Sequence, residues 1–124
     1  MELDALEPEV ELPYPLPAGA KIVTIEEARH SLKEAINVLM VLQAMSDEAH
    51  DLTEELEVLL DQFPMDHPHV MEVAEQLGGL VGQWQGNVAR LEGIGARIVC
   101  MDPGRLEWYG VVDRRMALFS WGMG

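Results

Sequence analysis

The run from Thr24 to Gly95 constrains the fold most, because it has the pattern of two long amphipathic helices joined by a short turn. Thr24 and Glu27 have the spacing of a capping box, in which each side chain accepts the other residue's backbone amide. Apolar residues then recur at the three- and four-residue spacing of a coiled-coil seam: Ile25, Ala28, Leu32, Ala35, Leu39, Leu42, Ala49, Leu56 and Phe63. Pro64 ends the pattern, which predicts a helix over residues 25–62. Ser46, followed by two acids, leaves the continuity of this helix open.

The second helix is predicted over residues 67–92, with Asp66 as its N-cap and Pro68 in its first turn. Its apolar stripe consists of Val70, Ala74, Leu77, Val81, Trp84, Val88 and Leu91, and the stop signals are Gly93 and Gly95. The short connection predicts an antiparallel pair. The first helix then overhangs the second, so residues 25–36 need cover from the C-terminal segment.

Two features of the helices indicate a further partner. The segment Ile36–Leu42 is apolar nearly all round, which is typical of a helix buried on more than one side. It is too short to cross a bilayer. Three glycines fall four residues apart on the second helix, which predicts either a smooth groove for a neighbouring helix or a locally weakened helix. We therefore predict a homodimer built as a four-helix bundle, with interface residues Val38, Val41, Gly78, Gly82 and Gly86.

After Gly95 the period of the pattern changes to two, which indicates strands at about 97–101, 105–109 and 115–121. Asp102-Pro103-Gly104 has the residues of a type II turn, and the next turn is expected from Gly110 to Arg114. A small sheet with one apolar face needs a cover, which the helices supply. The fold class is therefore α+β: a long antiparallel two-helix hairpin followed by a three-stranded antiparallel meander.

Residues 1–20 form an acidic, proline-rich arm that precedes a single domain over residues 21–124. The arm is either a ligand for a groove with aromatic walls or a tail that lies on its own body or a neighbour's. The formal charge of −14 comes from 22 acids against 8 bases, and it argues against nucleic acids and anionic membranes as partners. The single cysteine, Cys100, leaves no internal disulfide, and without a recognisable signal peptide or membrane span we expect a cytoplasmic protein.

Two groups of residues have the composition of metal ligands. Glu27 and His30 form a Glu-x-x-His step on one helix face, as in carboxylate-bridged bundle enzymes, and a dimer would double them. Asp66, His67 and His69 lie in one turn and can hold a divalent ion. The alternatives are a solvated helix face for the first group and a helix cap for the second. No other cofactor is predicted.

A third group clusters around the expected strand turns: Glu107, Trp108, Asp113, Arg115 and Trp121. These residues either frame a small polar pocket or serve as turn formers and cross-strand ion pairs. No Gly-x-Ser-x-Gly elbow or phosphate-binding loop is present. The leading functional hypothesis is therefore a non-enzymatic structural or interaction protein that self-associates through its helices. The alternatives are a metal-dependent bundle enzyme and a small-ligand binder at the sheet.

The two ends of the predicted domain resemble a small prokaryotic family of unknown function. The start, Val23-Thr24-Ile25-Glu26-Glu27-Ala28, is similar to that family's Phe-Thr-Leu-Glu-Glu-Ala. The end resembles its Gly-Leu-Val-Asp-Phe-Pro, Asp-Gly-Arg and Leu-Cys-Trp-x-Leu-Gly motifs, matched here by 104–109, 113–115 and 119–124. Glu107, Trp108, Tyr109 and Ser120 replace the family's Asp, Phe, Pro and Cys, and the Glu and Trp-His pair that usually follow are absent here. The resemblance covers residues 21–124 and implies an architecture without an activity.

Overall fold

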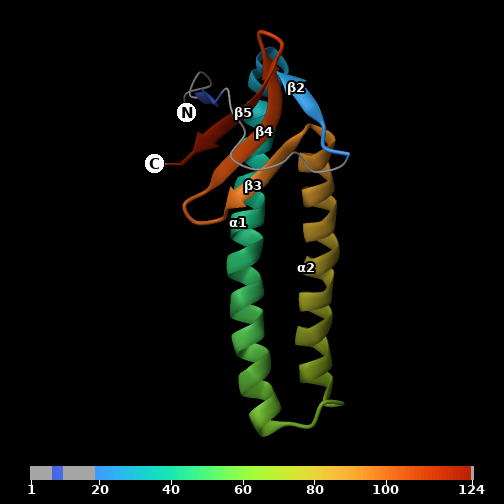
Figure 1. Cartoon of the computed structure of the whole chain (residues 1–124). Helices are drawn as coiled ribbons and strands as arrows, with labels where there is room; N and C mark the ends of the chain where they lie inside the picture. Colours follow the sequence, from blue (N-terminus) through green and yellow to red (C-terminus); the bar gives the residue numbers. More distant parts are fainter. Residues whose placement is uncertain (1–6, 10–18, 124) are drawn as a thin grey trace.

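The computed structural model of the chain describes residues 7–9 and 19–123. Two long helices stand side by side, and a small sheet lies against one end of the pair (Figure 1). The elements are β1 (Glu7–Glu9), β2 (Ile22–Thr24), α1 (Ile25–Gln62), α2 (Pro68–Gly93), β3 (Ala96–Cys100), β4 (Arg105–Val112) and β5 (Arg115–Gly122). The predicted α+β class and helical hairpin are confirmed. Most of the predicted arm, residues 1–20, lies outside the described residues.

Helix α1 begins with the predicted capping box. The backbone amide of Thr24 donates to Glu27 Oε1 over 2.9 Å, and the amide of Glu27 donates to Thr24 Oγ1 over 3.1 Å. The helix continues without a break through Ser46, and it ends where Phe63 takes an extended backbone before Pro64. The predicted bounds of 25–62 are therefore correct, and the capping box accounts for the first of them.

Helix α2 begins one residue later than predicted. The N-cap is His67 and not Asp66, because His67 Nδ1 accepts the amide of His69 and the His67 backbone is extended. Pro68 is the first helical residue, as expected. At the other end Gly95 has a φ of +83°, a left-handed conformation that favours glycine. Lys21 Nζ donates to the carbonyl oxygen of Gly93 over 2.7 Å, which ties the end of α2 to the segment before β2.

The face that α2 turns towards α1 differs from the predicted stripe. Val73 and Leu80 are buried, whereas Ala74 and Val81 are exposed. Both pairs fit a three- and four-residue spacing around Leu77 and Trp84, so the sequence pattern allowed two rotations of the helix about its axis. The structure adopts the rotation that buries the large side chain of Leu80.

The predicted three-stranded antiparallel meander is present, but the sheet also contains two strands that were not predicted, and one of them makes the sheet mixed. Strands β3, β4 and β5 are antiparallel neighbours, as expected, and β1 pairs antiparallel with β5. Strand β2 pairs parallel with β4, from Ile22 opposite Tyr109 to Thr24 opposite Val111. The reason is the length of β4, which extends beyond its pairing with β3 and leaves a free edge that β2 fills.

Two glycines that the sequence places in turns have another role. Gly104 has no positive φ, which a type II turn requires, and the bond between Asp102 and Pro103 is cis. A Cβ atom on Gly104 would lie 2.7 Å from Leu39 Cδ2, so its missing side chain lets this loop approach α1. Gly110 lies inside β4 and not in the following turn.

The turn between β4 and β5 consists of two residues, Asp113 and Arg114, with φ of 50° and 65°. Positive φ at both central positions is the geometry of a type I′ turn, which favours Asn and Gly. We expect Arg114→Gly to raise the free energy of unfolding by about 0.5–1 kcal/mol, because a side chain at positive φ is strained. Urea denaturation measures the change. Arg115→Gly is the matched control: it lies in β5 and should lower the free energy by a similar amount. A loss for both variants would contradict this interpretation of the turn.

The core lies where the sheet covers the N-terminal half of α1. Ile36, Val38, Leu39 and Leu42 are buried, whereas Met40 and Val41 in the same run are exposed. The sheet contributes side chains from one of its faces, namely Leu106, Trp108, Ala117, Phe119 and Trp121. The apolar run of α1 is thus covered by α2 and by the sheet of the same chain. Neither helix in the described part of the chain has the length and apolar character needed to cross a bilayer.

Candidate interaction surface on the helical hairpin

The first predicted metal pair, Glu27 and His30, lies at the start of α1. The backbone amide of Thr24, followed by its hydroxyl, lowers the pKa of the Glu27 carboxyl, which is therefore engaged in capping the helix. His30 lies in an open depression together with Glu26 and Glu27. Among the described residues, no three His, Cys, Asp or Glu side chains are grouped so that they could hold a metal ion.

The second predicted metal group lies at the tip of the hairpin. His67 caps α2, and its ring stacks on Phe63 with 4.2 Å between the ring centroids. His69 Nε2 lies 3.9 Å from a carboxylate oxygen of Glu55 on α1. Asp66 is exposed beside them. The two imidazoles therefore have separate structural contacts, one within the turn and one between the helices.

The residues of the predicted polar pocket are not brought together. Glu107 and Trp108 are neighbours on β4, so their side chains point to opposite faces of the sheet. Trp108 and Trp121 belong to the core, whereas Asp113 and Arg115 are exposed around the β4–β5 turn. Glu107 instead forms an ion pair with Arg97 at 2.5 Å, and the Arg97 guanidinium lies 4.5 Å from the centre of the Tyr109 ring.

The predicted interface residues lie in different environments. Val38 is buried within its own chain, and Val41 is exposed on α1. Gly78, Gly82 and Gly86 are exposed on α2, and a Cβ atom on any of them would meet nothing within 4 Å. The three glycines therefore leave a smooth surface on α2 that no other described part of the chain approaches.

The two helices differ in charge in segments that begin near the groove and run in opposite directions: the acids of α1 extend towards the tip of the hairpin, and the charge-free run of α2 extends towards β3. Helix α2 has no charged residue from Gln76 to Ala89. Helix α1 carries seven acids over a comparable length: Asp47, Glu48, Asp51, Glu54, Glu55, Glu57 and Asp61. Exposed helix surfaces are normally charged or polar. The uncharged stretch 76–89 of α2 therefore stands out in a chain of net charge −14.

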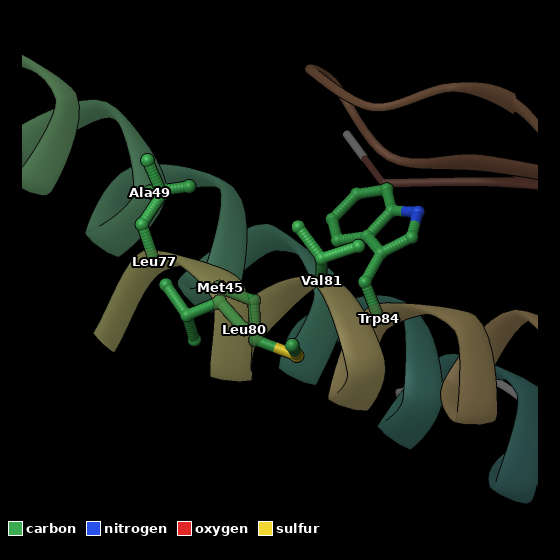
Figure 2. A pocket seen from close by; sticks show the side chains of 6 residues that line it. All are labelled: Met45, Ala49, Leu77, Leu80, Val81 and Trp84. Carbon is green, nitrogen blue, oxygen red and sulfur yellow. The ribbon is translucent and has the colours of Figure 1, made fainter. Parts of the chain in front are cut away.

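A groove about 140 Å³ in volume opens between the helices on this surface. Its wall is entirely apolar and is formed by Met45 and Ala49 of α1 and by Leu77, Leu80, Val81 and Trp84 of α2. Figure 2 shows the six side chains around the groove. Val81 is 54% exposed at its rim. The groove lies just beyond the sheet, because Gln43, two residues before Met45, donates from Nε2 to the carbonyl oxygen of Met101.

This groove was not predicted. The predicted stripes place Val81 in the helix seam and contain neither Met45 nor Leu80, because the sequence pattern allows two rotations of α2. The charge-free run of α2 was the available signal. A long stretch without charges on a surface helix indicates a contact surface. This signal does not depend on which rotation the helix adopts about its axis.

Comparison with known proteins gives a family without an activity. A family model described as an uncharacterised conserved protein, DUF2203, matches residues 21–124. No curated protein and no solved structure matched the chain. The match covers the whole predicted domain, from the segment before β2 to the end of the chain.

Proposed function

The chain belongs to the uncharacterised conserved family DUF2203, and we propose that it is a non-enzymatic interaction protein that self-associates through its helical hairpin. The observation that carries this proposal is the charge-free run of α2 from Gln76 to Ala89, which borders the apolar groove and exposes Val81 and the glycines 78, 82 and 86. Small side chains along this run allow another helix to approach closely, as the glycine spacing indicates.

Electrostatic repulsion restricts the way in which two copies of the chain can approach each other. Two chains of net charge −14 repel one another, and the repulsion is strongest between the acidic surfaces of α1. An approach through α2 keeps most of these acids apart. The apolar groove adds a hydrophobic contribution of about 25 cal/mol for each Å² of apolar surface removed from water.

The two alternative functions have less support. A metal-dependent bundle enzyme needs several ligands that project towards one point, and the described residues bring no third ligand to Glu27 and His30. A ligand site beside Trp108 and Trp121 needs polar groups that converge there, whereas Glu107 lies on the other face of the sheet. We therefore propose neither.

The test is the mass of the protein in solution. We expect the wild-type chain to show twice its chain mass of 13.8 kDa by light scattering, and Val81→Glu to return it towards 13.8 kDa. The new carboxylate would have to be buried at the contact without a partner, which raises the dissociation constant by more than about tenfold. Val81 is exposed within the chain, so the fold should persist, which circular dichroism checks.

The matched control is Asn37→Glu, which adds the same charge at an exposed position of α1 outside the proposed surface. It should leave the mass at that of a dimer. A wild-type mass of 13.8 kDa at every concentration would refute self-association. Equal effects of the two substitutions would show that the added charge, and not the surface of α2, is responsible.

A further inference from the structure

We propose that residues 10–18 cross the outer face of the sheet, so that the chain's own proline-rich segment is the ligand of this face. The outer face is the one turned away from the helices, and it carries Glu107, Tyr109, Leu118 and Ser120. This contact involves a different part of the molecule from the helical surface. It therefore goes beyond the proposed self-association and does not depend on it.

The outer face is buried although the helices pack on the other side of the sheet. Leu118 is 3% exposed and Tyr109 is 5% exposed, yet neither belongs to the core that joins the sheet to the helices. Glu107 and Ser120 on the same face are buried as well. A sheet face that meets only solvent leaves such side chains partly accessible, because residues on adjacent strands shield them only from the sides. Another segment of the same chain therefore covers this face.

The connection from β1 to β2 has to cross the sheet, whose strand order is β1-β5-β4-β2. Glu9 at the end of β1 pairs with Leu118, and Leu118 pairs with Tyr109. Tyr109 in turn pairs with Ile22, the first residue of β2. The connection thus starts and ends in one row of the sheet, three strand spacings apart, or about 14 Å. Both strands run in the direction of β4, so the connection is a crossover and not a hairpin.

The connection is long enough to pass over the outer face. Residues 10–21 can span about 40 Å in an extended conformation, at about 3.3 Å per residue, which is more than twice the width to be crossed. The other face of the sheet is closed to them. Trp108 and Phe119 are completely buried there, in the core shared with α1.

The chain re-enters the described part of the structure on the outer side. Gly19 and Ala20 line an open depression together with Arg97 and Tyr109. The Arg97 guanidinium lies 4.5 Å from the centre of the Tyr109 ring, and it pairs with Glu107 of the outer face. The residues just before β2 therefore lie beside the outer face, which places the end of the crossover on this side of the sheet.

The sequence of the segment suits an extended ligand. Leu12, Tyr14 and Leu16 alternate with three prolines. Proline and the residue before it favour an extended backbone, in which alternate side chains share one side. Prolines also restrict the free chain, which lowers the conformational entropy lost on binding. Extended proline-rich peptides commonly bind to aromatic surfaces, and Tyr109 provides the aromatic ring here.

Thiol labelling of the whole chain tests the proposal. In a Cys100→Ser background, Ser120→Cys places a thiol of similar size on the outer face. Its reaction with iodoacetamide should be at least about a hundredfold slower than that of Asn37→Cys, at an exposed position of α1. Combining Leu12→Ser with Leu16→Ser removes apolar contacts of the segment, and it should raise the rate at position 120 by more than about tenfold.

Three controls separate this contact from other causes. Leu60→Ser changes an exposed leucine of α1 and should leave the rate at position 120 unchanged. Ala117→Cys places the thiol on the core face of the same strand, and its rate should stay low in the chain with both leucine substitutions if the domain remains folded. Val81→Glu should also leave the rate at position 120 unchanged, which keeps this test separate from self-association.

Three outcomes would overturn the proposal. With residues 10–18 unchanged, a rate at position 120 as high as at position 37 would mean that the outer face is open. A low rate that the two leucine substitutions do not raise would mean that another segment covers the face. A rise at position 117 as large as that at position 120 would mean that the leucines support the core and not the outer face.

Discussion

Replacing Gly110 with alanine is expected to lower the free energy of unfolding by about 3 kcal/mol or more. A Cβ atom at this position would lie 2.1 Å from Cε2 of Phe119 and 2.5 Å from its Cζ. Phe119 is completely buried on β5, two residues from Ala117, the register partner of Gly110, so the ring has no solvent into which to move. Overpacking of a core usually costs about 1–3 kcal/mol, and two such close contacts with one rigid ring place this case at or above the upper end. Urea denaturation gives the value directly.

The control uses a glycine of the neighbouring strand. A Cβ atom on Gly122 of β5 would have its nearest neighbour at 3.5 Å, at an arginine side chain, so Gly122→Ala should change stability by less than about 0.5 kcal/mol. Combining Gly110→Ala with Phe119→Leu should cost at least about 1 kcal/mol less than the sum of the two single changes, because the smaller side chain makes room for the new methyl group. Equal losses for Gly110→Ala and Gly122→Ala would contradict the role assigned to the ring.

The helices were predictable because their signals are local. The capping box at Thr24 and the proline after Phe63 fixed both ends of α1 within one residue. The position of Gly110 was not predictable in the same way. Glycine is typical of turns, and only its contact with Phe119, a residue of another strand, explains why β4 continues through it.

The mixed sheet could not be predicted from the sequence for a related reason. Ile22–Thr24 is too short to give a period, and its pairing with β4 depends on the length by which β4 exceeds β3. The rotation of α2 about its axis also depends on contacts with distant residues, since either Leu80 or Val81 fits the seam between the helices. Local pattern thus predicts which segments are helical, and contacts between distant residues decide which of their faces remain exposed.

The second large effect is expected for Leu39→Ala. Leu39 is completely buried on the side of α1 that meets the sheet, where its Cδ2 lies against Gly104. Removing its side chain leaves a cavity between two rigid elements, α1 and the loop from Met101 to Gly104, and neither can close it without losing the hydrogen bond from Gln43 to Met101. Substitutions of this kind cost about 2–5 kcal/mol of unfolding free energy. Because the surroundings cannot close the cavity, we expect a value in the upper half of that range. Chemical denaturation of the variant measures the loss.

Met40→Ala is the matched control within the same apolar run. Met40 is 50% exposed, so its truncation should cost less than about 1 kcal/mol. The sequence alone does not separate these two neighbours, because the run from Ile36 to Leu42 is apolar on nearly every side. A large difference between the two variants would show that the run is buried by α2 and by the chain's own sheet, and that its exposed side does not hold the fold together. Similar losses would instead require that a partner covers Met40 as tightly as the sheet covers Leu39.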